Sequence, residues 1–288
     1  MPAKPALTLT QQVSLLRRRG LVIADDQAAE RFLYDANYYR LSGYARQFQR
    51  GPGAGDDNFH GGVTFERLQR IFVLDAELSA TLARCLGLIE RSVRARYAYE
   101  LAQASGNRAF YLDPSSYLAV TPNLDQFLDK VAGELSRANS AMVARYVCGD
   151  QDLTAVPVWV AFEVLSFGAV SRILDYHADR APRDRVAASY SEQKATFSST
   201  IHSLAVLRNR CAHHGQIWHR RLTIQTPVVR KVRRVEPAFD PQGPYPAILA
   251  IRRLLPRIHG GASVLVDLNA VLASDDELRV GVLSPRPA

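Results

Sequence analysis

The chain has 288 residues, of which 47% are hydrophobic, and carries a formal net charge of +8. This size fits one large domain or one domain with small additions, and the apolar content excludes a wholly disordered chain. No apolar run approaches the roughly 18–20 residues of a membrane-spanning helix, and the first five residues do not begin a signal peptide. Cys85, Cys148 and Cys211 are scattered and odd in number. They predict free thiols in a reducing, cytoplasmic setting without membrane association.

Two short helices are expected first. Thr8-x-x-Gln11 has the form of a capping box for a helix that Gly20 ends, and Asp25 or Asp26 caps the next helix. Such a pair can form a DNA-binding helix-turn-helix, but paired helices are common, and this is the weakest of the functional hypotheses.

Residues 37–44 place three tyrosines around Arg40 and Gly43. Their rings either stack on nucleic-acid bases or pack in a corner that joins the N-terminal part to the rest, and we favour the packed corner. Residues 51–62, rich in glycine, predict a flexible loop and the clearest domain boundary.

Thr64 caps the longest helical pattern, in which apolar residues recur at intervals of three and four to about Ala104. Glu90 and Arg94 lie one turn apart on this helix. Alternating charges usually mark a solvated face, and support of a functional site is the alternative.

The next elements are a loop over 111–123 and a helix that begins at Thr121-Pro122, followed by a short helix to Cys148. Residues 158–177 are strongly apolar and predict one central bundle helix. Glu163 is then a carboxylate on a mostly buried element. Because a buried ion needs a partner, we expect Glu163 to pair with Arg208 or His213 and to orient it, and an ordinary buried ion pair is the alternative.

Residues 196–215 predict the helix that closes the bundle, with apolar positions at Ile201, Leu204, Leu207 and Cys211. Gly215 stands where a left-handed residue ends a helix. Arg208 and His213 then lie in the last turns, roughly 140° apart with a rise of about 7.5 Å. They do not share one stripe, but the long arginine side chain can meet the imidazole at one phosphate.

The C-terminal part predicts an extended segment at 222–229, a Pro-rich linker at 236–246, and helices at 245–258 and 263–272. The whole chain is therefore expected to be all-α. It divides into an N-terminal helical subdomain, a helical bundle, and a linker with a C-terminal helical extension, at residues 1–62, 63–222 and 223–288.

Nine positive charges and no acidic residue lie between Gln193 and Val235, whereas basic and acidic residues nearly balance in the rest of the chain. This concentration of charge is typical of a polyanion site. The arginines expected to bind RNA are Arg210, Arg220, Arg221, Arg230 and Arg233.

Three chemistries are conceivable at this segment. A metal site is unlike the usual zinc patterns, because three of its potential ligands lie within four residues, and Cys211 falls on the buried helix face, which disfavours a nucleophile. Phosphodiester cleavage needs neither, since RNA supplies its own 2′-OH. A histidine can then move protons, and an arginine can stabilise the added negative charge on phosphorus.

Several separated stretches resemble one family. They are L-R-N-R-C-A-H-H-G-Q-I-W-H-R-R-L at 207–222, R-G-L-V-I at 19–23, N-Y-Y-R-L-S-G-Y at 37–44 and V-P-V-W-V-A-F-E-V-L-S-F-G at 156–168. Together they resemble the Abi family, the AbiD/AbiF-like abortive-infection proteins, a branch of the HEPN superfamily. The resemblance spans roughly residues 4–272 and implies a HEPN-type helical bundle.

The resemblance implies a metal-independent endoribonuclease that leaves a 2′,3′-cyclic phosphate and a 5′-OH through an Arg-x4–6-His motif. Arg208 and His213 are the catalytic pair, Asn209 holds local geometry, and His214 is the alternative histidine. No cofactor is implied. HEPN sites are typically shared across a dimer, so a homodimer is expected. The other hypothesis is a non-cleaving or inhibited RNA-binding protein, toxin-like in setting, that acts with a small regulatory RNA or a protein partner.

Overall fold

The computed structural model describes residues 6–106, 109–138, 140–147 and 152–286. Helices dominate this part of the chain, whose strands form one small two-stranded sheet. The predicted all-α fold class is therefore confirmed. Within these residues no helix combines the length and the apolar character that crossing a bilayer requires. Cys148 lies outside the described residues, so the predicted end of the short helix there has no structural counterpart.

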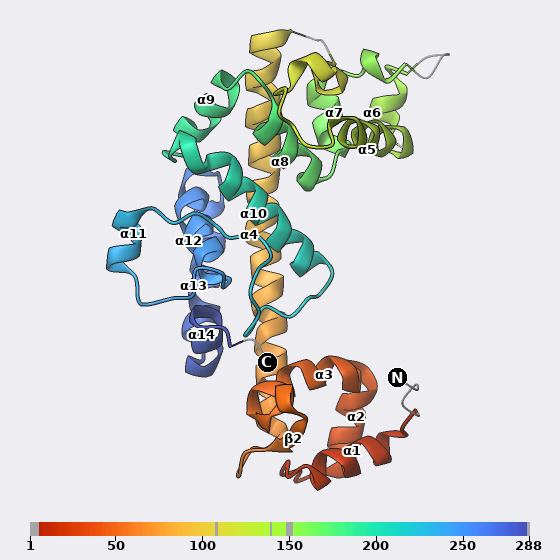
Figure 1. The fold of residues 1–288 in the computed structure, drawn as a ribbon, viewed down its shortest axis with the longest axis vertical. Helices are drawn as coiled ribbons and strands as arrows, with labels where there is room; N and C mark the ends of the chain where they lie inside the picture. The colour runs from red at the N-terminus through yellow and green to blue at the C-terminus, as the bar shows by residue number, and fades with distance from the viewer. Residues whose placement is uncertain (1–5, 107–108, 139, 148–151, 287–288) are drawn as a thin grey trace.

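Helix α4 (Phe65–Ser105) is the axis of the molecule, and its 41 residues give it a length of about 60 Å (Figure 1). The Thr64 hydroxyl accepts a hydrogen bond from the Arg67 amide and caps its first turn, as predicted. Elements from both halves of the chain pack along α4, with the N-terminal helices at one end and α5–α8 at the other (Figure 1).

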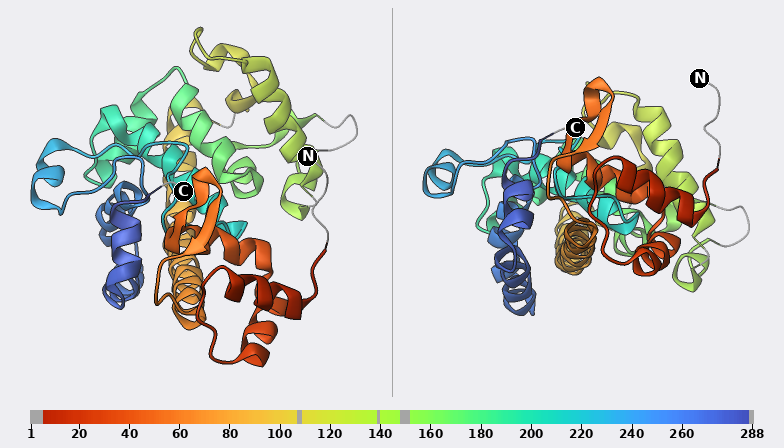
Figure 2. Two further views of the ribbon diagram at one scale, coloured as in Figure 1. Left: turned by 60° about the horizontal axis from the view of Figure 1, so that its bottom comes forward. Right: turned by 90° about the horizontal axis from the view of Figure 1, so that it is seen from below.

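The N-terminal elements are short and locally capped. They are α1 (Leu9–Arg18), α2 (Asp26–Ala36), α3 (Tyr38–Ala45), β1 (Gln49–Gly51) and β2 (Asp56–Phe59). The Thr8–Gln11 capping box is present, and Asp25 rather than Asp26 caps α2. The prediction of a loop at 51–62 is wrong in part, because β1 and β2 pair as an antiparallel hairpin whose turn includes Gly55 at φ 86°. Figure 2 shows this hairpin beside α1–α3.

The middle of the chain departs most from the predictions. Its helices are α5 (Leu124–Arg137), α6 (Ala141–Ala144), α7 (Val158–Val164) and α8 (Phe167–Tyr176). The expected single helix at 158–177 is broken because Ser166 starts α8 as its N-cap, and the Glu134 carboxylate accepts hydrogen bonds from the Ser166 amide and hydroxyl. Helix α5 begins after Asn123, not at Pro122. Two 3₁₀ turns, Phe110–Leu112 and Pro114–Ser116, lie within the predicted loop.

The C-terminal half contains α9 (Ala181–Ser189), α10 (Lys194–Ala212), α11 (Arg230–Val235), α12 (Tyr245–Leu254), α13 (Gly261–Ala273) and α14 (Asp276–Leu283). Helices α10, α12 and α13 match the predicted helices to within a few residues. Helices α9, α11 and α14 were not predicted. The predicted extended segment at 222–229 forms no strand.

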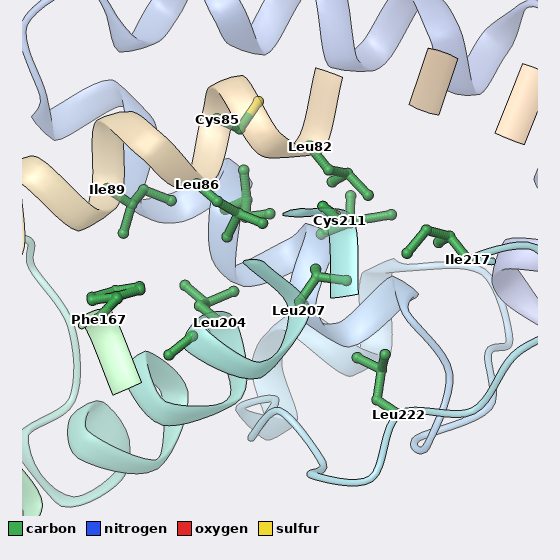
Figure 3. Packing of buried hydrophobic residues seen from close by; sticks show 14 of the residues in the cluster. Leu82, Cys85, Leu86, Ile89, Phe167, Leu204, Leu207, Cys211, Ile217 and Leu222 are labelled. Carbon is green, nitrogen blue, oxygen red and sulfur yellow. The ribbon is translucent and has the colours of Figure 1, made fainter. Parts of the chain in front are cut away.

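The contact between α4 and α10 fixes the position of the predicted site residues on α10. Figure 3 shows the apolar side chains that fill it, which are Leu82, Leu86 and Ile89 from α4, Leu204, Leu207 and Cys211 from α10, and Phe167, Ile217 and Leu222 from neighbouring segments. One continuous hydrophobic cluster includes residues of all three predicted segments, such as Leu16, Leu86 and Leu268. The N-terminal and C-terminal segments therefore share the core of the central bundle.

Candidate functional site

The C-terminal end of α10 carries the predicted catalytic pair. Arg208 lies in the last turns, and His213 is the C-cap residue. The left-handed residue is His214, with φ 54°, and not Gly215 as predicted. The His214 amide donates to the Cys211 carbonyl and the Gly215 amide to the Arg210 carbonyl. These two bonds form a Schellman motif, which fixes the backbone that presents His213 and His214.

Gly215 is needed for close packing rather than for its φ. A Cβ at this position would lie 2.9 Å from the Arg210 Cγ and 3.2 Å from the Arg210 carbonyl oxygen. Side-chain atoms do not normally approach so closely, so another residue here would force the helix end apart. The sequence correctly predicted that the helix ends near Gly215, but the left-handed residue is one position earlier.

Arg208 is oriented by a carboxylate on α4. Its Nε donates to Glu90 Oε2 at 2.9 Å, and its Nη1 lies 3.4 Å from Asn209 Oδ1. The other carboxylate oxygen of Glu90 binds Arg94, whose guanidinium also donates to the carbonyls of Phe162 and Glu163 at the end of α7. Glu90 and Arg94 are nearly buried, whereas 40% of the Arg208 side chain is exposed. The pair thus anchors Arg208 while leaving part of its guanidinium open to solvent.

The prediction that Glu163 is a buried ion paired with Arg208 or His213 is wrong. Glu163 is exposed, and its backbone carbonyl rather than its carboxylate takes part in the Arg94 interaction. The reason is the break after Val164, which leaves Glu163 in the last turn of a seven-residue helix. Glu90 pairs with Arg208 instead. This contact agrees with the alternative interpretation of Glu90 and Arg94, in which they support a site and do not merely form a solvated face.

Helix α3 contacts the segment that follows the predicted catalytic pair. Arg40 donates to the His214 carbonyl at 2.8 Å. A Cβ on Gly43 would lie 3.0 Å from Gln216 Oε1, so a glycine lets the two segments approach. The predicted packed corner at 37–44 is confirmed for Tyr44, which is buried and stacks on Trp218 with 6.2 Å between ring centroids, but not for the exposed Tyr39.

A buried carboxylate that sequence reasoning missed lies at this contact. Asp75 of α4 accepts hydrogen bonds from the Tyr44 hydroxyl at 2.6 Å and from the amides of Ile217 and Trp218 at 3.1 and 2.8 Å. Burial raises the pKa of Asp75, and the hydrogen bonds oppose that shift. The sequence could have indicated this buried carboxylate, because Asp75 lies in the same helical stripe as the apolar Ile71 and Leu78.

The histidines differ in solvent exposure, which distinguishes candidate catalytic histidines from buried structural ones. His213 and His214 are exposed. His219 is buried and accepts a hydrogen bond from the Arg286 amide at Nδ1, and desolvation lowers its pKa to about 4. Desolvation also lowers the pKa of His202, whose Nδ1 lies 3.1 Å from the Ser171 hydroxyl. His177 is also buried, and its Nδ1 lies 2.9 Å from the Asp179 carbonyl oxygen.

The five predicted RNA-binding arginines lie in two separate places in the fold. Arg210 donates to the Arg221 carbonyl, and Arg220 donates to Gln216 Oε1. The Arg221 guanidinium pairs with Asp240 at 2.7 Å. These three lie on or near the end of α10.

Arg230 and Arg233 lie on α11, at the edge of the molecule beyond α12 and away from the C-terminal end of α10 in both figures (Figures 1 and 2). The structure therefore does not gather the five arginines beside Arg208.

Nucleophilic thiol chemistry is disfavoured at this end of α10. Cys211 is 4% exposed, and burial raises the pKa of its thiol to about 11, so the reactive thiolate is scarce near neutral pH. No group of three or more His, Cys, Asp or Glu side chains arranged to hold a metal occurs in the described part of the chain.

The arrangement of these motifs agrees with the comparison to known families. The model of the family described as Abi-like protein matches residues 31–219, which is more than half of the chain. The chain belongs to the Abi-like protein family. No curated protein matches it, and no solved structure matches it.

The family match includes α3, α4, Glu90 and the Arg208–His213 segment, and it ends at His219, before Arg220 and the basic residues of α11. Membership indicates a role in abortive infection, a defence against phage. The end of α10 is thus within the family region, whereas much of the positive charge lies outside it.

Proposed function

We propose that this Abi-like protein is a metal-independent endoribonuclease of a phage-defence or toxin-like system, built on a HEPN-type bundle, with Arg208 and His213 as catalytic residues. The observation that supports this most is the Glu90–Arg208 ion pair at 2.9 Å, on the same helix whose C-cap residue is the exposed His213. An arginine tied through Nε keeps Nη2, and the second N–H of Nη1, for contacts with phosphate oxygens.

The reaction needs only groups of the RNA and of this chain. The 2′-oxygen attacks the adjacent phosphorus, its proton passes to a base, and the bond from phosphorus to the 5′-oxygen breaks. His213, as an imidazolium, protonates the departing 5′-oxygen, and Arg208 stabilises the negative charge on the phosphorane oxygens. The products are a 2′,3′-cyclic phosphate and a 5′-OH.

The supporting residues then have distinct roles. Asn209, whose Oδ1 lies 3.4 Å from Arg208 Nη1, limits the motion of the guanidinium. His214 is the second candidate for the acid, because it is equally exposed and adjacent. Each chain presents one such pair, so we also propose a homodimer in which two α10 ends face each other and supply the acid and the base from different subunits.

The test is cleavage of a mixed RNA pool in EDTA, followed by chemical mapping of the ends. Wild type is compared with Arg208→Ala and His213→Ala, and the controls are Arg91→Ala and His259→Ala, which remove exposed side chains of the same types elsewhere. We expect EDTA-resistant products with 2′,3′-cyclic phosphate ends from wild type and both controls, and none from the two site variants.

Cleavage that both site variants retain would reject the assignment. Tight RNA binding by wild type without cleavage would instead favour the other hypothesis, an RNA-binding protein that requires a partner. His214→Ala in the same assay decides between the two adjacent histidines, since only the catalytic one is required.

A further inference from the structure

A pocket lies beside α3, between this helix and the elements that precede and follow it. It is a pocket of about 410 Å³ between α1, α3 and the β1–β2 hairpin, within the range of small-ligand sites. Tyr39, Ser42 and Arg46 line it. They follow one another at intervals of three and four residues, so they share one side of α3. Arg40 lies on another side and holds the His214 carbonyl, so a single short helix separates the pocket from the catalytic pair.

The pocket contains polar groups without partners among the described residues. Gln12 Oε1 is buried and accepts no hydrogen bond there, although the amide nitrogen of the same side chain donates to the Leu7 carbonyl. The half-buried Arg46 guanidinium makes neither an ion pair nor a hydrogen bond within the described part of the chain. A buried acceptor without a donor is costly, so Gln12 Oε1 is suited to a ligand N–H.

The aromatic side chains of the pocket differ from the buried Tyr44. Tyr39 is 86% exposed, an unusual state for a ring next to a pocket. Tyr38 is half-buried, and its hydroxyl accepts a hydrogen bond from Arg19, which is itself paired with Asp57 at 2.6 Å. This arrangement fixes one wall of the pocket and leaves the other ring free to stack.

We propose that this pocket binds one unpaired base of an RNA strand whose backbone continues past Arg40 to the catalytic pair. Tyr39 stacks on the base, Gln12 Oε1 accepts one of its N–H groups, and Arg46 binds the adjacent phosphate. This inference rests on the proposed RNA substrate but not on cleavage itself. A flat ring with N–H donors and a phosphate linked to it through the sugar satisfies all three features together.

The experiment measures binding of fluorescein-labelled, single-stranded 12-nucleotide RNA to chains that carry His213→Ala, so that the probe survives. Base stacking on an aromatic side chain is worth about 1–3 kcal/mol, so Tyr39→Ala is expected to weaken binding about tenfold. The matched control is Tyr34→Ala, which removes a ring that is 80% exposed and does not line the pocket. We expect the control to bind like the parent. Both tyrosines are exposed, so neither change should affect folding.

A set of probes that each lack one base makes the test specific. One abasic position should weaken binding to the parent chain about tenfold but have little further effect on Tyr39→Ala, because the same contact is already lost. Additive losses at every position, or equal binding by Tyr39→Ala and the parent, would overturn the proposal and leave the pocket to a protein ligand.

Cleavage assays separate this proposal from the proposed function. In the otherwise unchanged chain, Tyr39→Ala should raise KM with little change in kcat, whereas Arg208→Ala should abolish cleavage. If RNA binding depends on Tyr39 but the chain with His213 intact never cleaves RNA, the pocket stands and the nuclease fails. If cleavage requires Arg208 while Tyr39→Ala changes neither KM nor binding, the nuclease stands and the pocket assignment fails.

Discussion

Replacing Glu90 separates the stabilising and catalytic consequences of one carboxylate. Only 9% of its side chain is exposed, and it is shared by Arg94, which is 11% exposed, and Arg208, which is 40% exposed. Glu90→Ala leaves the Arg94 guanidinium nearly buried without a counter-ion. Breaking a buried pair in this way costs about 3 kcal/mol. Solvent screens the more exposed Arg208 pair, which therefore adds little to stability.

Glu90→Gln keeps the size of the side chain and one acceptor, and its cost in stability should be smaller, about 1–2 kcal/mol. Its main effect should be on Arg208, which loses the charge that fixes its Nε. We expect single-turnover RNA cleavage to fall about 10–100-fold, equivalent to about 1.4–2.7 kcal/mol of activation free energy. Stability is measured by urea unfolding followed by circular dichroism, and cleavage is measured in EDTA at fixed ionic strength.

The matched control is Glu163→Gln, which changes an exposed carboxylate on α7. Its free energy of unfolding should stay within about 0.5 kcal/mol of wild type, and cleavage should be unchanged. The reasoning is refuted if Glu90→Gln retains full stability and full cleavage, or if Glu163→Gln has the larger effect.

Three further changes test other parts of the structure. Gly281→Ala should destabilise the protein by about 3 kcal/mol, because the new Cβ would lie 2.1 Å from Trp218 Nε1; urea unfolding measures the loss. The pKa of His219 is about 4 in the folded chain, below its ordinary value of 6.5. The neutral imidazole therefore contributes its full stabilisation to the free energy of unfolding above pH 6.5, and this stabilisation should be lost as the pH falls toward 4. This amounts to about 2 kcal/mol after allowance for solvent screening, measured as the difference between wild type and His219→Asn across that pH range. Gly215→Ala should lower cleavage about tenfold by displacing the end of α10, where a Cβ would lie 2.9 Å from the Arg210 Cγ, with a smaller loss of stability.

Gly87→Ala is the control for both glycine changes. A Cβ at Gly87 meets only the far end of the Arg91 side chain, at 3.8 Å, within the long helix α4. It should stabilise the protein by up to about 1 kcal/mol through helix propensity and leave cleavage unaltered. Loss of stability in this variant equal to that of Gly281→Ala would show that close contact is not the cause.

Local capping was predictable because each cap joins residues within one turn. Thr8 with Gln11 and Thr64 with Arg67 are examples, and the helices that they begin were placed correctly. The break at Ser166 was not predictable in this way, because Glu134, 32 residues away, satisfies the Ser166 amide and hydroxyl. Such a partner appears only once α5 and α8 are packed together.

The site shows the same division. The position of Arg208 and His213 at the end of α10 followed from helical periodicity and from the Gly215 signal. The choice of Glu163 over Glu90 as the partner of Arg208 failed because it assumed one unbroken helix through residue 163. The packing of α4 against α10, which brings Glu90 to Arg208, cannot be read from either sequence neighbourhood.

The central claim, that the RNA supplies its own nucleophile while Arg208 and His213 act on it without metal, is tested most directly on the substrate. Once one cleavage position is mapped, an RNA is made with a single 2′-deoxynucleotide on the 5′ side of that bond. We predict that wild type in EDTA no longer cuts this bond and still cuts other positions at the unmodified rate. Cleavage of the deoxy-substituted bond at the original rate would contradict the account, because the attacking oxygen would have to come from elsewhere.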